Sequence, residues 1–330
     1  MVAGRIFTHA RADIEATRGA GGTPDLKVIF DEGDHAQGVG TIYPARLSGS
    51  YEDHYDAAAG TETNELTFSG LVDFNQMALW GALFFKGITT GTGAGANKTW
   101  AFLPTQTTDD LKSLLVQFGV TDTLGASTPG WSIPYCVGEE FTLGYSKAPD
   151  SPGITFSARL VSPKAATQIT AFTGTGPEPA LQLASHVNTQ VYIDSSTLGA
   201  TADNYVTAVD FRLSNGFVNL FTLNNSTSAQ DTFRPNARDW SATFTRYWIN
   251  DTELDAYVAK TPRKIRIRTT GAVLGSGTYQ MDLEMYGVWL DRSWTEQDGL
   301  RLEQLTLGRR YDTGAATSLN LSVVNALASI

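Results

Sequence analysis

Short apolar runs rich in Val, Ile, Phe, Tyr, Trp and Thr recur along the whole chain and are separated by turn residues. Runs of this kind are typical of β-strands. Two of them alternate clearly. In one, Met281, Leu283 and Met285 face one side and Gln280, Asp282 and Glu284 the other. In the second, Leu66 and Phe68 are opposed to Glu65, Thr67 and Ser69. One face of each sheet is therefore expected to be polar. We predict strands at residues 27–30, 65–74, 140–146, 154–161, 191–193, 206–213, 217–223, 242–249, 264–269, 279–290 and 300–307.

Helical patterns are few. Residues 75–86, 108–118 and 251–259 are the candidates, and each would be a short helix against a sheet. The strands do not alternate with helices of about 10 to 15 residues, which argues against a doubly wound parallel sheet. The fold class is therefore predicted to be mainly β.

Five sequence cues occur twice in the same order, which indicates an internal repeat. We predict two related β-sandwich domains, 1–186 and 187–330, each with a short flanking helix. A coincidence of strand composition, within a single large sandwich, is the alternative. Residues 105–134 have no partner in the second half and would be an insertion. The cues are Val28-Ile-Phe-Asp-Glu with Val191-Tyr-Ile-Asp-Ser, Arg46-Leu-Ser-Gly-Ser-Tyr with Arg212-Leu-Ser-Asn-Gly-Phe, Leu66-Thr-Phe-Ser with Ala242-Thr-Phe-Thr, Glu140-Phe-Thr-Leu-Gly-Tyr with Met281-Asp-Leu-Glu-Met-Tyr, and Gly153-Ile-Thr-Phe-Ser with Gly299-Leu-Arg-Leu-Glu.

Composition narrows the function classes. The 330 residues are 42% hydrophobic and 18% charged, so disorder is not expected. The net charge of -10 is the wrong sign for a protein that grips DNA through its phosphates. Cys136 is the single cysteine, which excludes an internal disulfide. We see no signal peptide and no apolar run of membrane-spanning length, and expect a soluble protein folded in a reducing cytoplasm.

No motif with catalytic chemistry stands out, so we predict no enzyme, no cofactor and no metal site. The glycine-rich segment 91–99 has Asn97 where a P-loop needs glycine, which favours a flexible loop. Asp31, Asp34 and His35 could hold a cation, but a solvated acidic turn explains them better. Residues 263–268 form a basic strand that favours a charged outer face or an acidic partner.

The tryptophans allow a second interpretation, as stacking platforms for sugar rings. Trp80, Trp248 and Trp289 lie inside apolar runs, and we expect them to be core or subunit-interface residues instead.

The chain resembles the tail tube (major tail) proteins of long-tailed bacteriophages, in the form with two fused tube domains. The resemblance rests on Arg46-Leu-Ser-Gly-Ser-Tyr, Glu65-Leu-Thr-Phe-Ser-Gly-Leu-Val-Asp-Phe with the helix-like run 75–87, and Trp100-Ala-Phe-Leu-Pro. The hairpin 140–160 and a weaker second copy extend it to about residue 307.

The resemblance implies a structural protein of a virion, assembled in the host cytoplasm. Three chains would form a ring in which the inner sheets join into a barrel, and rings would stack into a tube that conducts DNA during ejection. Partners would be other copies, the tape measure, terminator and tip proteins, and DNA as cargo without specific binding. Residues 31–43, 88–98, 105–134 and 311–330 would bridge rings.

The acidic balance fits such a channel, because cationic walls would hold the phosphates of DNA. The candidates for lumen-facing carboxylates are Glu65, Asp73, Asp282 and Glu284. Two other functions remain open: a virion decoration or capsid-associated β protein, and, as the weaker alternative, a carbohydrate-binding β-sandwich.

Overall fold

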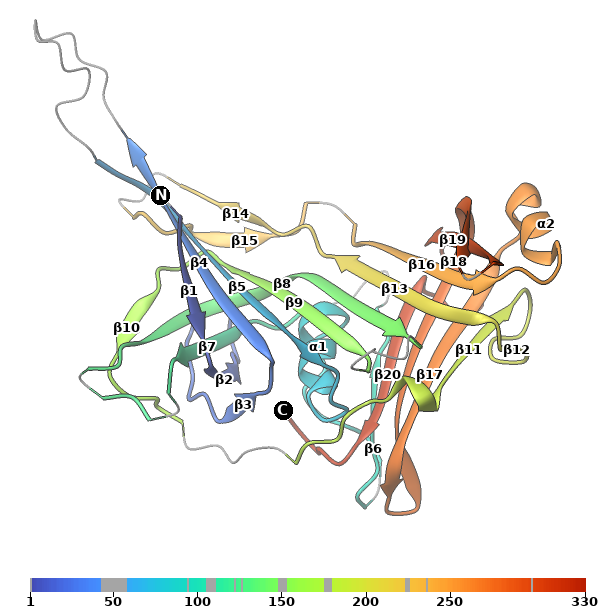
Figure 1. The fold of residues 1–330 in the computed structure, drawn as a ribbon. Helices are drawn as coiled ribbons and strands as arrows, with labels where there is room; N and C mark the ends of the chain where they lie inside the picture. Colours follow the sequence, from blue (N-terminus) through green and yellow to red (C-terminus); the bar gives the residue numbers. More distant parts are fainter. Residues whose placement is uncertain are drawn as a thin grey trace, which may run out of the picture.

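The structure is a computed structural model that describes residues 2–42, 58–93, 95–104, 111–121, 123–125, 127–147, 153–174, 180–222, 226–235, 237–297 and 299–330. The chain is mainly β, and its strand pairings are antiparallel (Figure 1). Its first half contains β1 (Val2–Phe7), β2 (His9–Ile14), β3 (Leu26–Val28), β4 (Glu32–Ile42), β5 (Ala58–Leu71), α1 (Met77–Phe84), β6 (Lys98–Phe102), β7 (Leu114–Gly119), β8 (Gly130–Ser146), β9 (Thr155–Ser162) and β10 (Thr167–Ile169).

The second half begins with a short 3-10 helix, His186–Asn188. It continues with β11 (Thr189–Asp194), β12 (Ala202–Asp203), β13 (Val206–Ser214), β14 (Val218–Leu220), β15 (Asp231–Phe233), β16 (Asp239–Tyr247), α2 (Thr252–Ala259), β17 (Arg263–Leu274), β18 (Gly277–Gln297), β19 (Leu300–Arg309) and β20 (Leu319–Asn325).

One sheet runs through both halves of the chain. Its strand order is β1, β4, β5, β9, β8, β13, β16, β19 and β18, and we call it the long sheet. The halves meet where residues 140–146 of β8 pair with residues 208–214 of β13. The two halves therefore share a backbone hydrogen-bond ladder as well as one hydrophobic core.

Two shorter sheets lie behind the long sheet and share one strand each with it. The amino-terminal part of β8 pairs with β7 and β10, and β7 continues to β2 and β3. The amino-terminal part of β18 pairs with β17 and β20, and these continue to β11, β12 and β6. Long strands that pass from one sheet to another make each half a sandwich.

The same set of pairings occurs in each half. In the first half β4–β5, β5–β9, β9–β8, β8–β7, β7–β2, β2–β3 and β8–β10 are paired. In the second half β13–β16, β16–β19, β19–β18, β18–β17, β17–β11, β11–β12 and β18–β20 are paired. Strand by strand, the two series follow the same order along the chain.

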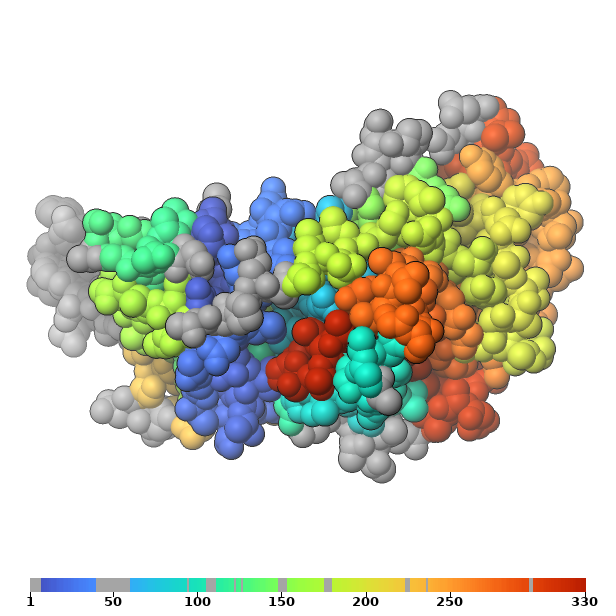
Figure 2. Space-filling view, turned by 90° about the horizontal axis from the view of Figure 1, so that it is seen from below, coloured from blue at the N-terminus to red at the C-terminus, as the bar shows by residue number. Residues whose placement is uncertain are grey.

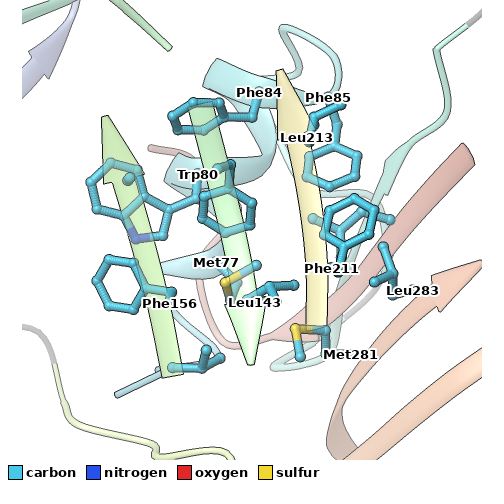
Figure 3. Packing of buried hydrophobic residues seen from close by; sticks show 14 of the residues in the cluster. Met77, Trp80, Phe84, Phe85, Leu143, Phe156, Phe211, Leu213, Met281 and Leu283 are labelled. Atoms are coloured by element: carbon cyan, nitrogen blue, oxygen red, sulfur yellow. The ribbon is translucent and has the colours of Figure 1, made fainter. Parts of the chain in front are cut away.

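Helix α1 lies in the core of the molecule, and all eight of its residues are buried. Phe84 stacks on Phe141 of β8 with ring centroids 5.0 Å apart, and Phe85 stacks on Phe211 of β13 at 6.3 Å. Figure 3 shows Phe84, Phe85 and Phe211 in the same apolar cluster as Met281 and Leu283 of β18. The helix is thus packed against strands of both halves.

The structure confirms the alternation that the sequence indicated. Met281, Leu283 and Met285 are 0% exposed, and Leu66 and Phe68 are 1% exposed. The candidate helices at 75–86 and 251–259 are confirmed as α1 and α2. The candidate at 108–118 is wrong: residues 105–110 lie outside the described part, and Leu114–Gly119 is strand β7. Every residue of β7 is buried, and a short run buried on both faces shows no alternation that would distinguish it from a helix.

The repeat cues differ in how well they match equivalent strands. Leu66 and Ala242 lie in β5 and β16, which have equivalent pairings. Val28 and Val191 do not correspond, because Val28 lies in β3 whereas Val191 lies in β11, the counterpart of β2. Arg46 lies outside the described residues. The domain boundary at 186/187 stays a prediction, and β8–β13 pairing crosses it.

The carboxy-terminal segment, predicted to be an arm that bridges rings, contains β20 at residues 319–325. This strand pairs with β18 on one side and with β6 of the first half on the other. Figure 2 shows the carboxy-terminal residues lying against the segment around β6. At least this part of the segment belongs to the fold of its own chain.

Candidate functional site

The outward face of the long sheet is polar across both halves. Alternation places Phe68, Phe141, Phe211 and Phe244 inward, so their neighbours along each strand point outward. Many outward side chains of the long sheet carry hydroxyl groups: Thr67, Ser69, Ser157, Thr142, Ser241, Thr243, Thr245, Thr306, Ser293 and Thr295.

Carboxylates outnumber arginines on the same face. The outward carboxylates are Glu32, Asp34, Glu65, Glu139, Glu140, Asp210, Asp239 and Asp291, and the outward arginines include Arg159 and Arg212. Arg159 binds Glu65 at 2.8 Å, and Arg212 binds Glu140 at 2.8 Å. These pairs cross from strand to strand, so part of the negative charge is neutralised. The face as a whole keeps an acidic excess.

The environment of Glu139 shows this excess. Burial raises the pKa of its carboxyl group, and the neighbouring carboxylates of Glu140 and Glu65 raise it further. The backbone N–H of Phe217 donates to Glu139 at 2.8 Å, and that hydrogen bond, together with the Arg159 guanidinium, acts in the opposite direction.

The four carboxylates predicted to line a lumen do not lie on one face. Glu65 lies on the outward face of the long sheet. Asp282 and Glu284 lie on the amino-terminal part of β18, in a shorter sheet, where they pair with Arg268 at 2.6 Å and Arg266 at 2.7 Å. The basic strand therefore finds its acidic partners within its own chain.

Asp73 has a different place. It is 2% exposed and accepts hydrogen bonds from the backbone N–H groups of Asn75, Gln76 and Gln182 at the start of α1. Burial is the main reason why its pKa is raised. A buried carboxylate with this role in the chain's own fold cannot repel a passing polyanion. Whether the other three face a lumen depends on the assembly and stays a prediction.

One edge of the long sheet is unpaired. Residues 287–297 of β18 pair with β19 on one side. Beyond Gly287, no strand in the described part of the chain pairs with the other side. At the opposite end of the sheet, β1 covers residues 33–38 of β4.

Large apolar side chains are exposed near the unpaired edge. Leu290 is 57% exposed and Trp294 is 45% exposed, and Trp294 contacts Trp248 with ring centroids 6.2 Å apart. Arg292 lies over the Trp294 ring at 3.9 Å. Clusters of exposed aromatic residues at a sheet edge are typical of protein–protein contacts. The prediction that Trp80 and Trp289 are core residues is confirmed, since they are 1% and 0% exposed.

The other residues considered for metal binding or catalysis do not form a site in the described part of the chain. His35 points inward and bonds Asn64 at 2.9 Å, whereas the adjacent Asp34 points outward, so the two side chains do not converge on a cation. Within the described residues no group of three His, Cys, Asp or Glu side chains could hold a metal ion. Burial raises the pKa of the Cys136 thiol.

Thr92 and Thr99 exchange backbone hydrogen bonds across the glycine-rich segment, which is a hairpin without a following helix. None of the helices described is long and apolar enough for a membrane span.

Comparison with known proteins gives limited similarity. No family model and no curated protein sequence matches the chain. The hybrid NMR and cryo-EM structure of the SPP1 tail tube is similar over 42% of this chain and 77% of that chain, with 12% identity and a TM-score of 0.25. The crystal structure of a Pseudomonas aeruginosa FadL homologue aligns over 89% of this chain and 68% of its own, with 10% identity and a TM-score of 0.11. TM-scores of this size do not establish a shared fold over the chain.

Proposed function

We propose that this protein is the structural subunit of a viral tail tube, in which copies of the chain form rings and the rings stack into a channel for DNA. The observation that carries the proposal is the long sheet, which already joins two similar sandwiches side by side through β8 and β13. Repeating that contact between chains would extend the sheet around a ring. Three chains would supply six sandwiches.

The faces of the long sheet suit this arrangement. Its inward face packs the core, and its outward face is covered with hydroxyl and carboxylate groups. In a closed ring the outward face would line a wet lumen, and closure would remove unpaired edges that otherwise promote aggregation. An acidic lumen would not bind the phosphates of DNA, so the duplex could pass without sticking.

If the outward face of the long sheet lines the lumen, the carboxylates that line it are not the same four that the sequence suggested. Asp34, Glu65, Asp210 and Asp291 are outward on the long sheet, whereas Asp282 and Glu284 are on another sheet and already paired. Changing Asp210 and Asp291 together to Lys should slow DNA ejection from assembled particles. Changing Asp255, which lies on α2 rather than on the long sheet, to Lys is the control. Equal ejection rates for both variants would contradict an acidic lumen.

The test of the function is assembly of the purified protein. We expect negative-stain microscopy at high protein concentration to show hollow tubes of uniform width. A virion decoration protein would instead remain small and attach to capsids. A carbohydrate-binding protein would remain monomeric and bind immobilised glycans. Either result, without tubes, would contradict the proposal.

Further expectations follow from a tail tube role. The protein would be part of the virion, would be assembled in the host cytoplasm, and would contact tape measure, terminator and tip proteins. It would need no cofactor and would catalyse no reaction. Immunogold labelling along the tails of intact particles would test its location.

A further inference from the structure

The contact between the two halves is a template for a contact between chains. In this contact, residues 140–146 of β8 pair antiparallel with residues 208–214 of β13. The strand order of each half makes β18 the counterpart of β8 and β4 the counterpart of β13. Each chain therefore has a second β8-like strand and a second β13-like strand.

Residues that lie opposite each other in neighbouring strands show which positions of the two halves correspond. Leu66 of β5 is opposite Leu160, and its counterpart Ala242 of β16 is opposite Leu307. Continuing across β9 and β19 matches residues 140–146 of β8 with residues 291–297 of β18. An independent feature supports this match, because the register shifts between Gly138 and Glu140 and again between Trp289 and Asp291. The bulge lies at the same position in both strands.

The same procedure matches β13 with β4. Phe244 of β16 is opposite Val209, and Phe68 of β5 is opposite Gly33. Residues 208–214 of β13 therefore correspond to residues 32–38 of β4. In this chain, β1 pairs with residues 33–38 of β4. Strand β1 thus covers nearly the same stretch of β4 that β8 covers on β13.

We propose that β1 is a displaceable cover, and that residues 291–297 of β18 from a second copy of the chain replace it on β4. This inference rests on the proposed function, because tube rings need a head-to-tail contact, in which one edge of a copy meets the other edge of the next. The β8–β13 register predicts the pairs Arg292 with Gln37, Ser293 with Ala36, and Trp294 with His35.

The strand that covers β4 differs in composition from the strand that pairs with β13. Strand β8 contributes Phe141, Leu143 and Tyr145 to the core beside β13, and all three are buried. Residues 2–6 of β1 include Ala3 and Gly4, which are poor strand formers. Phe7, at the end of β1, is buried, and its ring lies 5.4 Å from Phe68. Peeling residues 2–6 from β4 would leave this aromatic contact in place.

Pairing with β4 would also stabilise the incoming residues 291–297 of β18. The free edge of this strand carries the exposed Trp294, and the exposed Leu290 lies earlier on the same strand. Pairing with β4 would satisfy the unpaired backbone groups of the edge and cover Trp294. A ring of such contacts would leave no edge of the long sheet open.

Cysteine cross-linking tests the register. We expect Ser293→Cys combined with Ala36→Cys to give disulfide-linked chains after mild oxidation, because directly opposite residues have Cβ atoms about 4.5–5.5 Å apart. Ser293→Cys combined with Asp34→Cys is the control, since the diagonal separation of about 7–8 Å is too long. The native Cys136 is buried and stays in all variants.

A second disulfide tests displacement. Gly4 lies opposite Ala36, so Gly4→Cys combined with Ala36→Cys should lock β1 onto β4 within one chain. We expect the oxidised protein to lose assembly and the reduced protein to regain it. Deleting residues 1–5 should lower the protein concentration at which assembly begins.

The outcomes separate the inference from the proposed function. Tubes without the 293–36 cross-link, or tubes formed by the oxidised 4–36 variant, would overturn the inference and leave the function intact. Cross-linked 293–36 chains that never form tubes would support the inference and contradict the function.

Discussion

The two halves of the chain share their strand pairings but use their helices differently. All eight residues of α1 are buried, whereas in α2 only Glu253 and Ala256 are. Helix α1 lies beneath strands of both halves, and α2 lies at the outer end of the second half (Figure 1). Similar strand order therefore does not determine how the helix packs. What matters is whether a neighbouring half is present to cover it.

The chemistry of each helix follows from this difference. Helix α1 contacts its surroundings through Met77, Trp80, Phe84 and other apolar side chains. Helix α2 is attached through a charged group, because Glu253 binds Arg263 at 2.9 Å and accepts a hydrogen bond from the Trp289 indole at 2.7 Å. The comparison predicts that the halves respond differently to substitution.

The largest effect is expected in α1. Trp80→Ala should lower the free energy of unfolding by about 4 kcal/mol, because it leaves a cavity between Phe68 and Phe156. Val258→Ala in α2 is the matched control and should have little effect, since Val258 is 71% exposed. Urea unfolding followed by far-UV circular dichroism measures the free energy of unfolding of both variants. This signal does not depend on the fluorescence of the tryptophan that is replaced. Similar losses in the two variants would contradict the difference between the helices.

A smaller loss is expected at the charged attachment of α2. Glu253→Gln should cost about 3 kcal/mol, because it leaves the Arg263 guanidinium buried without a counter-charge. The double variant Glu253→Gln with Arg263→Met should recover part of the loss, since neither buried charge remains. If the double variant is less stable than the single one, the ion pair is not the cause.

A third feature is common to both halves and was missed in the sequence. Glu15 follows β2 and accepts hydrogen bonds from the backbone N–H groups of Gly19 and Gly21. Asp194 ends β11 and accepts from those of Gly199, Ala200 and Thr201. In each half, a buried carboxylate thus fixes the loop after the counterpart strand. Ile14-Glu15 and Ile193-Asp194, each followed by a Gly-Ala pair, were the available signal.

Replacing these carboxylates by amides tests the similarity of the halves. Asp194→Asn and Glu15→Gln should each cost about 2 kcal/mol, because an amide offers one acceptor oxygen where two are used. Proteolysis within residues 195–201 or 16–22 should become faster in the corresponding variant. Asp210→Asn, an exposed position, is the control. A loss confined to one half would show that the two loops are not equivalent.

The sequence predicted elements better than their arrangement. Alternation identified the polar and apolar faces of β5 and β18, because each side chain's environment there depends only on its own strand. It could not show that β8 changes sheets near Tyr135, where φ is 59°, or that β13 joins β8. Those features depend on pairings between segments far apart in the chain.

The same limit applied to the candidate site. In the sequence, Glu65, Asp73 and Asp282 are equivalent candidates, since all are acidic residues in or next to strand-like runs. Only tertiary packing places Asp73 under α1 and Asp282 beside Arg268. The outward residues Asp34, Asp210 and Asp291 were missed because their strands had to be ordered first.

The smallest predicted effect concerns the stability of the folded protein at alkaline pH. It is expected on substitution of the part-buried Tyr286 and not of an exposed tyrosine. Burial, with the Glu284 and Asp312 carboxylates nearby, raises the pKa of Tyr286 to about 12 from 10 in an unfolded chain. Between pH 10 and 12 the folded protein keeps this proton and the unfolded chain releases it, so stability falls as pH rises. Tyr286→Phe should make this decline less steep, as measured by urea midpoints across that range. Tyr205→Phe, at a position 46% exposed, is the control, and an unchanged slope in Tyr286→Phe would contradict the role of burial at β18.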